Sequence, residues 1–181
     1  MTKRPLILAL AAAILAAAPV SAALQEGARV PSLVTQGALA GKAFSFNLQQ
    51  ELRKGPVVLY FFPKAFTPGC NLEAQAFAEA IGDFREAGAQ VIGMSGDNLD
   101  DLAQFSEKEC AGAFPVARAT PSTIEAFDVA LTMNGQKSDS LTSRTSYVIA
   151  PDGKVVMVHS DLNWAEHVAK TLAAVRALKN S

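Results

Sequence analysis

The segment at positions 57–62 consists of six consecutive apolar residues and follows Gly55-Pro56. An unbroken apolar run of this length is typical of a strand that is buried on both faces of a sheet. Pro63 ends the predicted strand, because proline has no N–H to donate to a neighbouring strand. Similar short apolar runs predict further strands at positions 89–95, 114–118, 146–150 and 155–159.

Between these runs, apolar residues recur at the three- and four-residue spacing of a helix. Positions 68–86 are predicted as one helix that ends at Gly88. Its apolar face is formed by Ala74, Phe77, Ile81 and Phe84. A second helix is predicted from a cap at Asp97 or Asn98 to about position 110, and a short helical turn runs from a cap at Ser122 to position 127.

The two ends of the chain complete the predicted fold. A last helix is expected to bury one face made of Trp164, Val168, Leu172, Val175 and Leu178. Positions 30–35 and 42–46 flank the sequence Gly-Ala-Leu-Ala-Gly and predict a short N-terminal β-hairpin. The order of elements therefore predicts an α/β fold, with a central mixed β-sheet flanked by helices on both faces.

The first 22 residues have the features of a secretory signal peptide. Lys3 and Arg4 are followed by an apolar run at positions 6–20, and Val20-Ser21-Ala22 offers the small residues that signal peptidase accepts. The alternative is an uncleaved membrane anchor, but the run is shorter than the ~20 apolar residues that usually span a bilayer. We expect cleavage near Ala22 and an exported protein, periplasmic or secreted, with no membrane association afterwards.

Composition agrees with one compact domain, predicted at residues 23–181. The chain has 181 residues, of which 50% are hydrophobic and 18% charged, and its formal net charge is -1. These values exclude a disordered protein. A net charge near zero also gives no electrostatic reason to expect nucleic acid as a partner.

The potential metal ligands are few. His159 and His167 have no cysteine at metal-ligand spacing, so both are predicted to be ordinary surface or strand-edge histidines. Asp97, Asp100 and Asp101 fit a helix cap and its first turn. Neither a metal nor another cofactor is expected. The chain also has no Cys-x-x-Cys motif, which argues against a thioredoxin or disulfide-isomerase function.

One cysteine lies where a buried strand leads into a helix. Positions 63–70 read Pro-Lys-Ala-Phe-Thr-Pro-Gly-Cys, which places Cys70 in the first helical turn. Unpaired backbone N–H groups there favour an anion and so stabilise a thiolate. The alternative is that Cys70 is a small buried apolar residue. The Thr-Pro-Gly turn favours a reactive thiolate, because it should keep the sulfur at the end of an element, near solvent.

These residues resemble a known family. Pro63, Thr67 and Cys70 match the Pro-x-x-x-Thr-x-x-Cys signature of peroxiredoxins, and the wider stretch is similar to the bacterioferritin comigratory protein, or Q-type, branch. The resemblance continues through positions 93–97, 105–108, 114–115 and 144–154. It implies a thioredoxin-like fold, an antioxidant thiol peroxidase that reduces hydrogen peroxide or organic hydroperoxides, and a monomer. It also implies that Cys70 is the peroxidatic cysteine, supported by Thr67, Pro63 and Arg144.

A depressed thiol pKa cannot explain such catalysis alone. Lowering the pKa from about 8.5 to about 6 raises the thiolate fraction at pH 7 roughly 30-fold, but the weaker nucleophilicity of this thiolate lowers the rate roughly 13-fold. Donors aimed at the reacting oxygens must therefore supply most of the rate enhancement. The expected donors are the Thr67 hydroxyl, the backbone N–H groups of Gly69 and Cys70, and the Arg144 guanidinium. Pro63 would cover the sulfur and limit access of water.

The fate of oxidised Cys70 depends on a second thiol. In the commonest members of the branch, a resolving cysteine follows the peroxidatic one by five positions, but that position here is Gln75. The resemblance extends to members with a resolving cysteine in the next helix, which implies that Cys110 forms an intramolecular disulfide with Cys70. A thioredoxin-like donor would then reduce it. Because the cysteines belong to separate helices, the first turn of the Cys70 helix should unwind.

Two alternatives to this mechanism remain open at this point. In the first, Cys110 simply fills the core, since it shares a helical face with Leu99 and Ala103. The protein is then a one-cysteine peroxidase that is resolved by an external thiol. In the second, the chain is a non-enzymatic thioredoxin-fold binding domain with a structural disulfide between Cys70 and Cys110.

Overall fold

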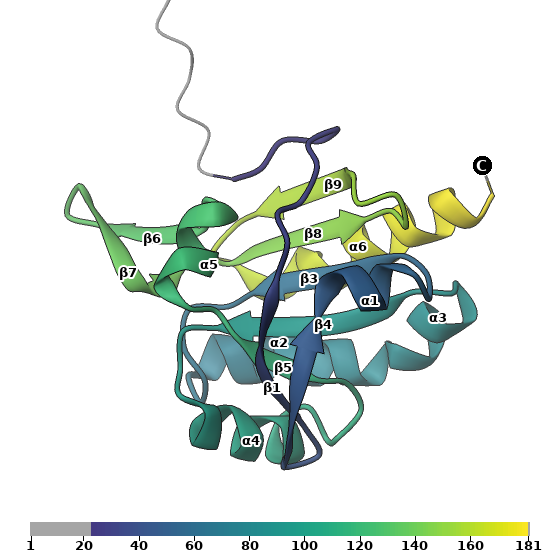
Figure 1. Ribbon diagram of the computed structural model, residues 1–181. Coiled ribbons are helices and arrows are strands. Elements are labelled where there is room, and N and C mark those ends of the chain that lie inside the picture. Colours follow the sequence, from purple (N-terminus) through teal and green to yellow (C-terminus); the bar gives the residue numbers. More distant parts are fainter. Residues whose placement is uncertain (1–22, 181) are drawn as a thin grey trace, which may run out of the picture.

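A computed structural model describes residues 23–180, and the predicted signal segment 1–22 lies outside the described residues. The central element is a seven-stranded sheet with the order β2-β1-β5-β4-β3-β8-β9, accompanied by the two-stranded sheet β6-β7 (Figure 1). The strands are β1 (Val34–Leu39), β2 (Lys42–Asn47), β3 (Val57–Phe61), β4 (Gln90–Ser95), β5 (Val116–Arg118), β6 (Ala130–Met133), β7 (Gln136–Thr142), β8 (Thr145–Ile149) and β9 (Val155–Ser160). The sheet is mixed, because β3, β4 and β5 are parallel and the other pairs are antiparallel.

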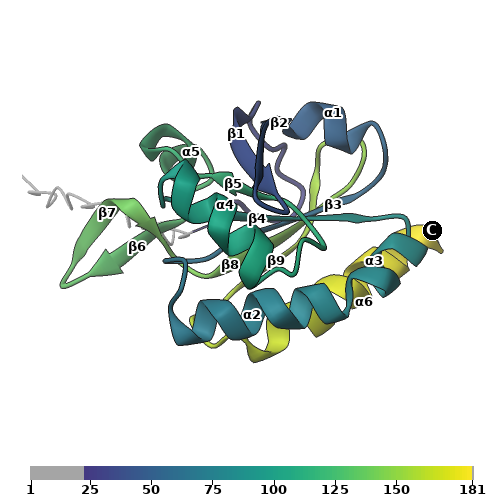
Figure 2. The same ribbon diagram turned by 90° about the horizontal axis from the view of Figure 1, so that it is seen from below.

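Helices cover both faces of this sheet. They are α1 (Leu48–Leu52), α2 (Pro68–Glu79), α3 (Ile81–Glu86), α4 (Leu99–Lys108), α5 (Pro121–Ala126) and α6 (His167–Lys179), preceded by the 3₁₀ turn η1 (Trp164–Glu166). One core lies under α2, α3, α4 and α6, and the other lies under α1 and α5. Figure 2 shows α2 and α6 side by side on the first face, where the two helices are in contact. The predicted central mixed sheet flanked by helices is confirmed.

Strand β3 separates the two cores, as its unbroken apolar run predicts. All five of its residues are buried. Val58 and Tyr60 face one core, while Leu59 and Phe61 face the other. This alternation follows from the two-residue period of a strand, and it leaves Phe62 and Pro63 at the carboxyl end of β3 as the entry to the next segment.

Several predicted boundaries were wrong. The N-terminal hairpin exists, but its turn is only Ala40-Gly41, both with positive φ, so β1 includes Gly37. A two-residue turn of this kind matches the twist of the flanking strands. The helix predicted at 68–86 is interrupted at Ala80, two residues before Gly82, whose helix propensity is low. The short helix after β5 is capped by Thr120 instead of Ser122, with Pro121 in its first turn.

The face of the last helix was also only partly predicted. In α6, Val175 is buried, but Val168, Leu172 and Leu178 are half-buried, and the other buried residues are His167 and Thr171. The helix begins at His167, after Trp164. Among residues 23–180, no helix combines the length and the apolar character needed to cross a bilayer.

Candidate active site

Cys70 is the third residue of α2, as the sequence predicts. Thr67 has extended backbone angles and is the N-cap, Pro68 is the first helical residue, and the Asn71 N–H donates to the Thr67 carbonyl at 2.9 Å. The N–H groups of Gly69 and Cys70 precede this first helical hydrogen bond. They are therefore the amides that a helix leaves without an intrahelical acceptor, and they favour negative charge at this point.

The loop between β3 and α2 is held from both sides. Thr142 donates its hydroxyl to the Phe62 carbonyl at 2.8 Å, and the Asp97 carboxylate accepts from the Ala65 N–H and from the Ser95 hydroxyl, both at 2.7 Å. Asn98, the alternative that the sequence left open, caps α4. Asp97 therefore fixes the loop that precedes Cys70, a role the sequence pattern did not indicate.

Arg144 reaches Cys70 from the neighbouring strand. Its Nη2 lies 3.4 Å from the Cys70 Sγ, and its Nε donates to the Leu162 carbonyl at 2.9 Å. Because β3 and β8 are adjacent and antiparallel, the residue before β8 lies beside the loop that follows β3. Burial alone would lower the pKa of Arg144, but the Glu73 and Cys70 side chains raise it above its ordinary value. The guanidinium is thus a permanent positive charge at the sulfur.

Pro63 and Thr67 lie in the same loop, but neither hydrogen-bonds to the Cys70 sulfur. Pro63 is half-buried directly after β3, and Thr67 donates its hydroxyl to the Lys64 carbonyl at 2.9 Å. The expectation that the turn keeps Cys70 near solvent was wrong, since only 1% of its surface is exposed. Gly69 and Trp164 flank the site, and both are half-buried. The Trp164 ring is so close to Gly69 that a Cβ atom added at this position would contact it.

Two residues that sequence analysis missed complete the site. Glu73 lies one turn after Cys70, is fully buried and pairs with Arg144 Nη1. His167 is also fully buried, so its prediction as a surface or strand-edge histidine was wrong; His159 does lie in the edge strand β9. The three-residue spacing from Cys70 could have indicated Glu73, because such residues share a helical face. No comparable signal places His167.

Cys110 lies in the core beyond the end of α4. Cys70 and Cys110 are both buried and both free, and they belong to the same core cluster. Burial raises the pKa of the Cys110 thiol well above its usual range, and Glu109 adds to the rise. Ala111 and Gly112 both have positive φ, so the chain turns sharply directly after Cys110. Gln75 on α2 donates to the Glu109 carboxylate at 3.1 Å, which brings α2 next to this segment.

The hydroxyl of Tyr60, on β3, is buried without a hydrogen-bond partner among the described residues. An unsatisfied buried hydroxyl is destabilising. We therefore expect Tyr60→Phe to raise the free energy of unfolding by about 1 kcal/mol, measured by urea denaturation. Tyr147→Phe is the matched control, because that hydroxyl donates to the Phe127 carbonyl at 2.8 Å and accepts from the Leu24 N–H at 3.1 Å. The free energy of unfolding of Tyr147→Phe should fall by about 1–3 kcal/mol. Equal losses in both variants would contradict the assignment.

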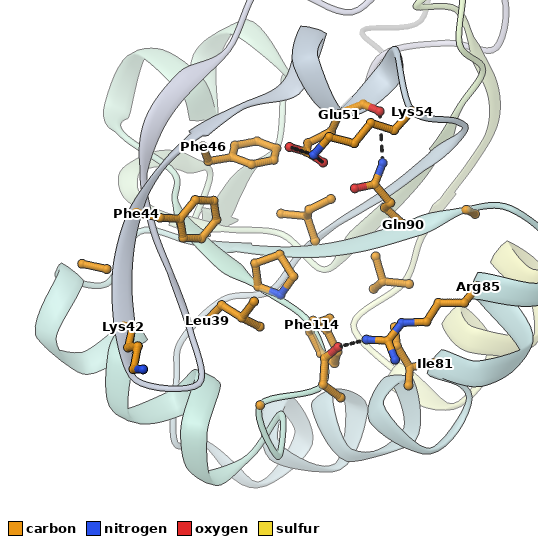
Figure 3. Close-up of a pocket in the computed structure, with 17 residues that line it drawn as sticks. Leu39, Lys42, Phe44, Phe46, Glu51, Lys54, Ile81, Arg85, Gln90 and Phe114 are labelled. Atoms are coloured by element: carbon orange, nitrogen blue, oxygen red, sulfur yellow. Dashed lines mark hydrogen bonds and ion pairs between the residues drawn. The ribbon is translucent and has the colours of Figure 1, made fainter.

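A groove of about 610 Å³ opens elsewhere on the molecule (Figure 3). Phe44 and Phe46 line one side, and Ile81, Arg85 and Phe114 line the other. It lies at the beginning of β4, whereas Cys70 follows the end of the parallel strand β3, so the two are at opposite edges of the sheet. None of the predicted site residues lines it. The groove is therefore separate from the cysteine chemistry.

Within residues 23–180, no group of three or more His, Cys, Asp or Glu side chains is placed to hold a metal ion.

Comparisons with known proteins agree with this geometry. The AhpC/TSA family model matches residues 27–158. Peroxiredoxin Bcp of Xanthomonas campestris is 33% identical over 67% of this chain and 76% of the relative, and peroxiredoxin Bcp of Escherichia coli is 32% identical over 61% and 72%. The crystal structure of peroxidoxin BcpB from Mycobacterium tuberculosis has a TM-score of 0.76 and 30% identity, covering 86% of this chain and 98% of that chain. Xanthomonas campestris peroxiredoxin Q has a TM-score of 0.69 and 29% identity, covering 80% and 90%.

Proposed function

Because the chain belongs to the AhpC/TSA family, in its Bcp or Q-type peroxiredoxin branch, we propose a two-cysteine thiol peroxidase mechanism in which Cys70 attacks hydroperoxides and Cys110 resolves the product. The family and the predicted thioredoxin-like fold are confirmed, and membership implies a hydroperoxide substrate and a thiol reductant. The observation that carries the assignment of Cys70 is the Arg144 Nη2 at 3.4 Å from its sulfur, in the first turn of α2.

The proposed first step moves charge from sulfur to oxygen. The Cys70 thiolate attacks one oxygen of a hydroperoxide, so that an S–O bond forms and the O–O bond breaks. The departing oxygen leaves as hydroxide or alkoxide and takes up a proton, and Cys70 becomes a sulfenic acid. Arg144 and the N–H groups of Gly69 and Cys70 face the region where this negative charge develops. They supply the preorganised donors that such a displacement needs.

Access to the sulfur requires a small opening. The closed site leaves 1% of the Cys70 surface exposed, and half-buried Thr67, Gly69 and Trp164 border it. Local opening of the first turn of a helix is a low-energy motion compared with global unfolding. The same motion serves the second step, in which Cys70 must leave this turn.

The position of Gln75 supports Cys110 as the resolving thiol. Gln75 occupies the place of the resolving cysteine in the commonest members of the branch, and its amide contacts Glu109, the neighbour of Cys110. The Cys110 thiolate would attack the sulfenic sulfur, forming the S–S bond as hydroxide leaves and is protonated to water. A disulfide needs a Cα separation below about 7 Å. We therefore propose that the first turn of α2 unwinds and the Cys110 segment moves on oxidation.

Treatment with one equivalent of hydrogen peroxide tests this mechanism. The wild-type protein should lose two hydrogens in mass, and peptide mapping should find a Cys70–Cys110 disulfide within one chain. Cys110→Ser should still react once, but stop as a sulfenic acid that dimedone traps. Undiminished steady-state turnover in Cys110→Ser would instead favour resolution by an external thiol. No reaction in either protein would favour the binding-domain alternative.

The physiological setting is part of the proposal. We propose an exported, monomeric enzyme that is re-reduced by a thioredoxin-like donor, with the signal peptide cleaved near Ala22. N-terminal sequencing of the protein recovered from periplasm and cytoplasm would test the export. Reduction of the isolated disulfide form by a thioredoxin, compared with glutathione, would test the donor.

A further inference from the structure

A buried cluster behind Arg144 extends from α2 to α6. One oxygen of the Glu73 carboxylate pairs with Arg144, and the other, Oε1, lies 3.7 Å from His167 Nδ1. The same Nδ1 is 2.8 Å from the Ser146 hydroxyl, and Nε2 is 2.9 Å from the Asp161 carbonyl. Glu73, Ser146 and His167 all have no exposed surface. The cysteine site is thus joined through two charged residues to a buried histidine.

The hydrogen-bond partners determine which imidazole nitrogen carries the proton. A carbonyl oxygen only accepts, so Nε2 must donate to Asp161, and in the neutral ring Nδ1 has a lone pair. That lone pair can accept the Ser146 hydroxyl proton, and it also faces Glu73 Oε1, a buried oxygen without a hydrogen-bond partner among the described residues. Two acceptors facing each other in a dry site repel. One proton between them, on either atom, removes the conflict.

We propose that Glu73 and His167 share one proton, and that this proton sets how strongly Arg144 acts on the Cys70 sulfur. The inference rests on the proposed function of Cys70. With the proton bound, the Glu73 charge is neutralised or held by His167, and Arg144 is free to stabilise the thiolate and the oxygen that departs from the peroxide. Without it, the Glu73 carboxylate competes with the thiolate for the same guanidinium. His167 is therefore a positioning residue that acts through Glu73.

The cluster has few other charged neighbours. On β9, the His159 ring centroid lies 4.5 Å from that of His167, and Lys170 Nζ of α6 lies 3.4 Å from His159 Nδ1. Asp161 faces His167 with its carbonyl, and Glu166 is paired with Lys170 at the surface. Among the described residues, the other titratable groups that interact with Glu73 are Arg144, which also contacts the Cys70 sulfur, and Tyr60 of β3, whose pKa burial raises.

The direction of the pKa shifts supports one shared proton. Burial raises the pKa of Glu73 to about 7, against the opposing effect of Arg144, and burial lowers the pKa of His167 to about 4. Near pH 5.5, the unfolded chain carries its proton on the histidine and the folded chain carries it on the glutamate. Folding therefore moves the proton with no net uptake. The raised pKa of Glu73 contributes stability that is fully present below pH 4.5 and is lost as the pH rises through 7. The lowered pKa of His167 has the opposite effect: its contribution is fully present above pH 6.5 and is lost as the pH falls through 4.

Glu73→Gln removes the proton site but keeps the shape of the side chain. In wild type, the rate of reaction with hydrogen peroxide, followed by the fluorescence of Trp164, the single tryptophan, should fall about tenfold as pH rises through 7. In Glu73→Gln this tenfold fall should be absent. The two profiles having the same shape would overturn the proposal, while a wild type that does not react at all would overturn the proposed function instead.

Two measurements do not depend on activity. The ¹⁵N chemical shift of His167 Nδ1 should change near pH 7 in wild type, because the proton that Glu73 then loses lies beside it, while the ring keeps its own proton on Nε2. This change should be absent in Glu73→Gln, and His159→Gln assigns the two rings. Between pH 6.5 and 4, the unfolding constant of Glu73→Gln should rise about tenfold per pH unit, because only the histidine then takes up a proton on unfolding. The unfolding constant of wild type should change much less over this pH range. A wild-type His167 signal that is unchanged from pH 6 to 8 would contradict the shared proton.

Discussion

Replacing Cys70 with serine is expected to lower the rate of thiol-dependent hydroperoxide reduction by about 10⁴-fold or more, because the attacking atom itself is removed. A serine hydroxyl does not ionise at neutral pH, so it needs a general base before it can attack. Of the polar side chains in the described structure, only Arg144 bonds to the sulfur, and arginine cannot accept a proton. Peroxide consumption with a dithiol reductant, at matched protein concentration, measures the effect.

The fold provides a control for this substitution. Serine is smaller than cysteine and Cys70 is buried, so some loss of stability is expected, and the free energy of unfolding must be measured with the activity. Cys110→Ser makes the same chemical change in the same core, but it should retain the first reaction with peroxide. Retained turnover in folded Cys70→Ser would show that the chemistry lies elsewhere in the chain.

The part of the site that is local in sequence could be predicted from the sequence. The apolar run at 57–62, a proline that ends it and a Thr-Pro-Gly turn are enough to place Cys70 in a first helical turn, because each signal acts on the backbone within a few residues. The resemblance added Arg144, which no local pattern indicates. Its approach to Cys70 depends on β8 lying beside β3, a pairing between segments more than 80 residues apart.

The remaining site residues depend on tertiary packing. His167 looks like any polar residue near a helix start, and the contacts of α6 with β8 and with α2 place it against Glu73. The sequence predicted a face of Val168, Leu172 and Val175 because apolar residues usually face a core. The structure buries Val175 as predicted, but it also turns His167 and Thr171 inward, since both have buried hydrogen-bond partners. Burial of Cys70 escaped prediction for the same reason, because a turn signal carries no information about what packs over it.

Arg144→Met is expected to lower kcat/KM for hydrogen peroxide by about 10²–10³-fold, because it removes the cationic donor at the sulfur while leaving the thiol in place. Methionine keeps much of the length of the arginine stem and so limits the cavity. The slow reaction that remains should still produce the Cys70 sulfenic acid. Stopped-flow Trp164 fluorescence measures the rate, and a loss below threefold would show that the guanidinium is structural.

The same substitution also affects stability, in a way that separates the two roles of Arg144. Its removal leaves the Glu73 carboxylate buried without its cation, which costs about 3–5 kcal/mol if that carboxylate stays ionised. Burial already raises the pKa of Glu73 to about 7, and loss of the cation raises it further. Protonation therefore relieves the penalty at low pH, so Arg144→Met should be close to wild type in stability at pH 6 and much weaker at pH 8.5. Adding Glu73→Gln to Arg144→Met should restore stability at pH 8.5 without restoring the rate, because the unpaired charge is gone but the donor at the sulfur is still missing. Recovery of both together would mean that Arg144 serves only to neutralise Glu73.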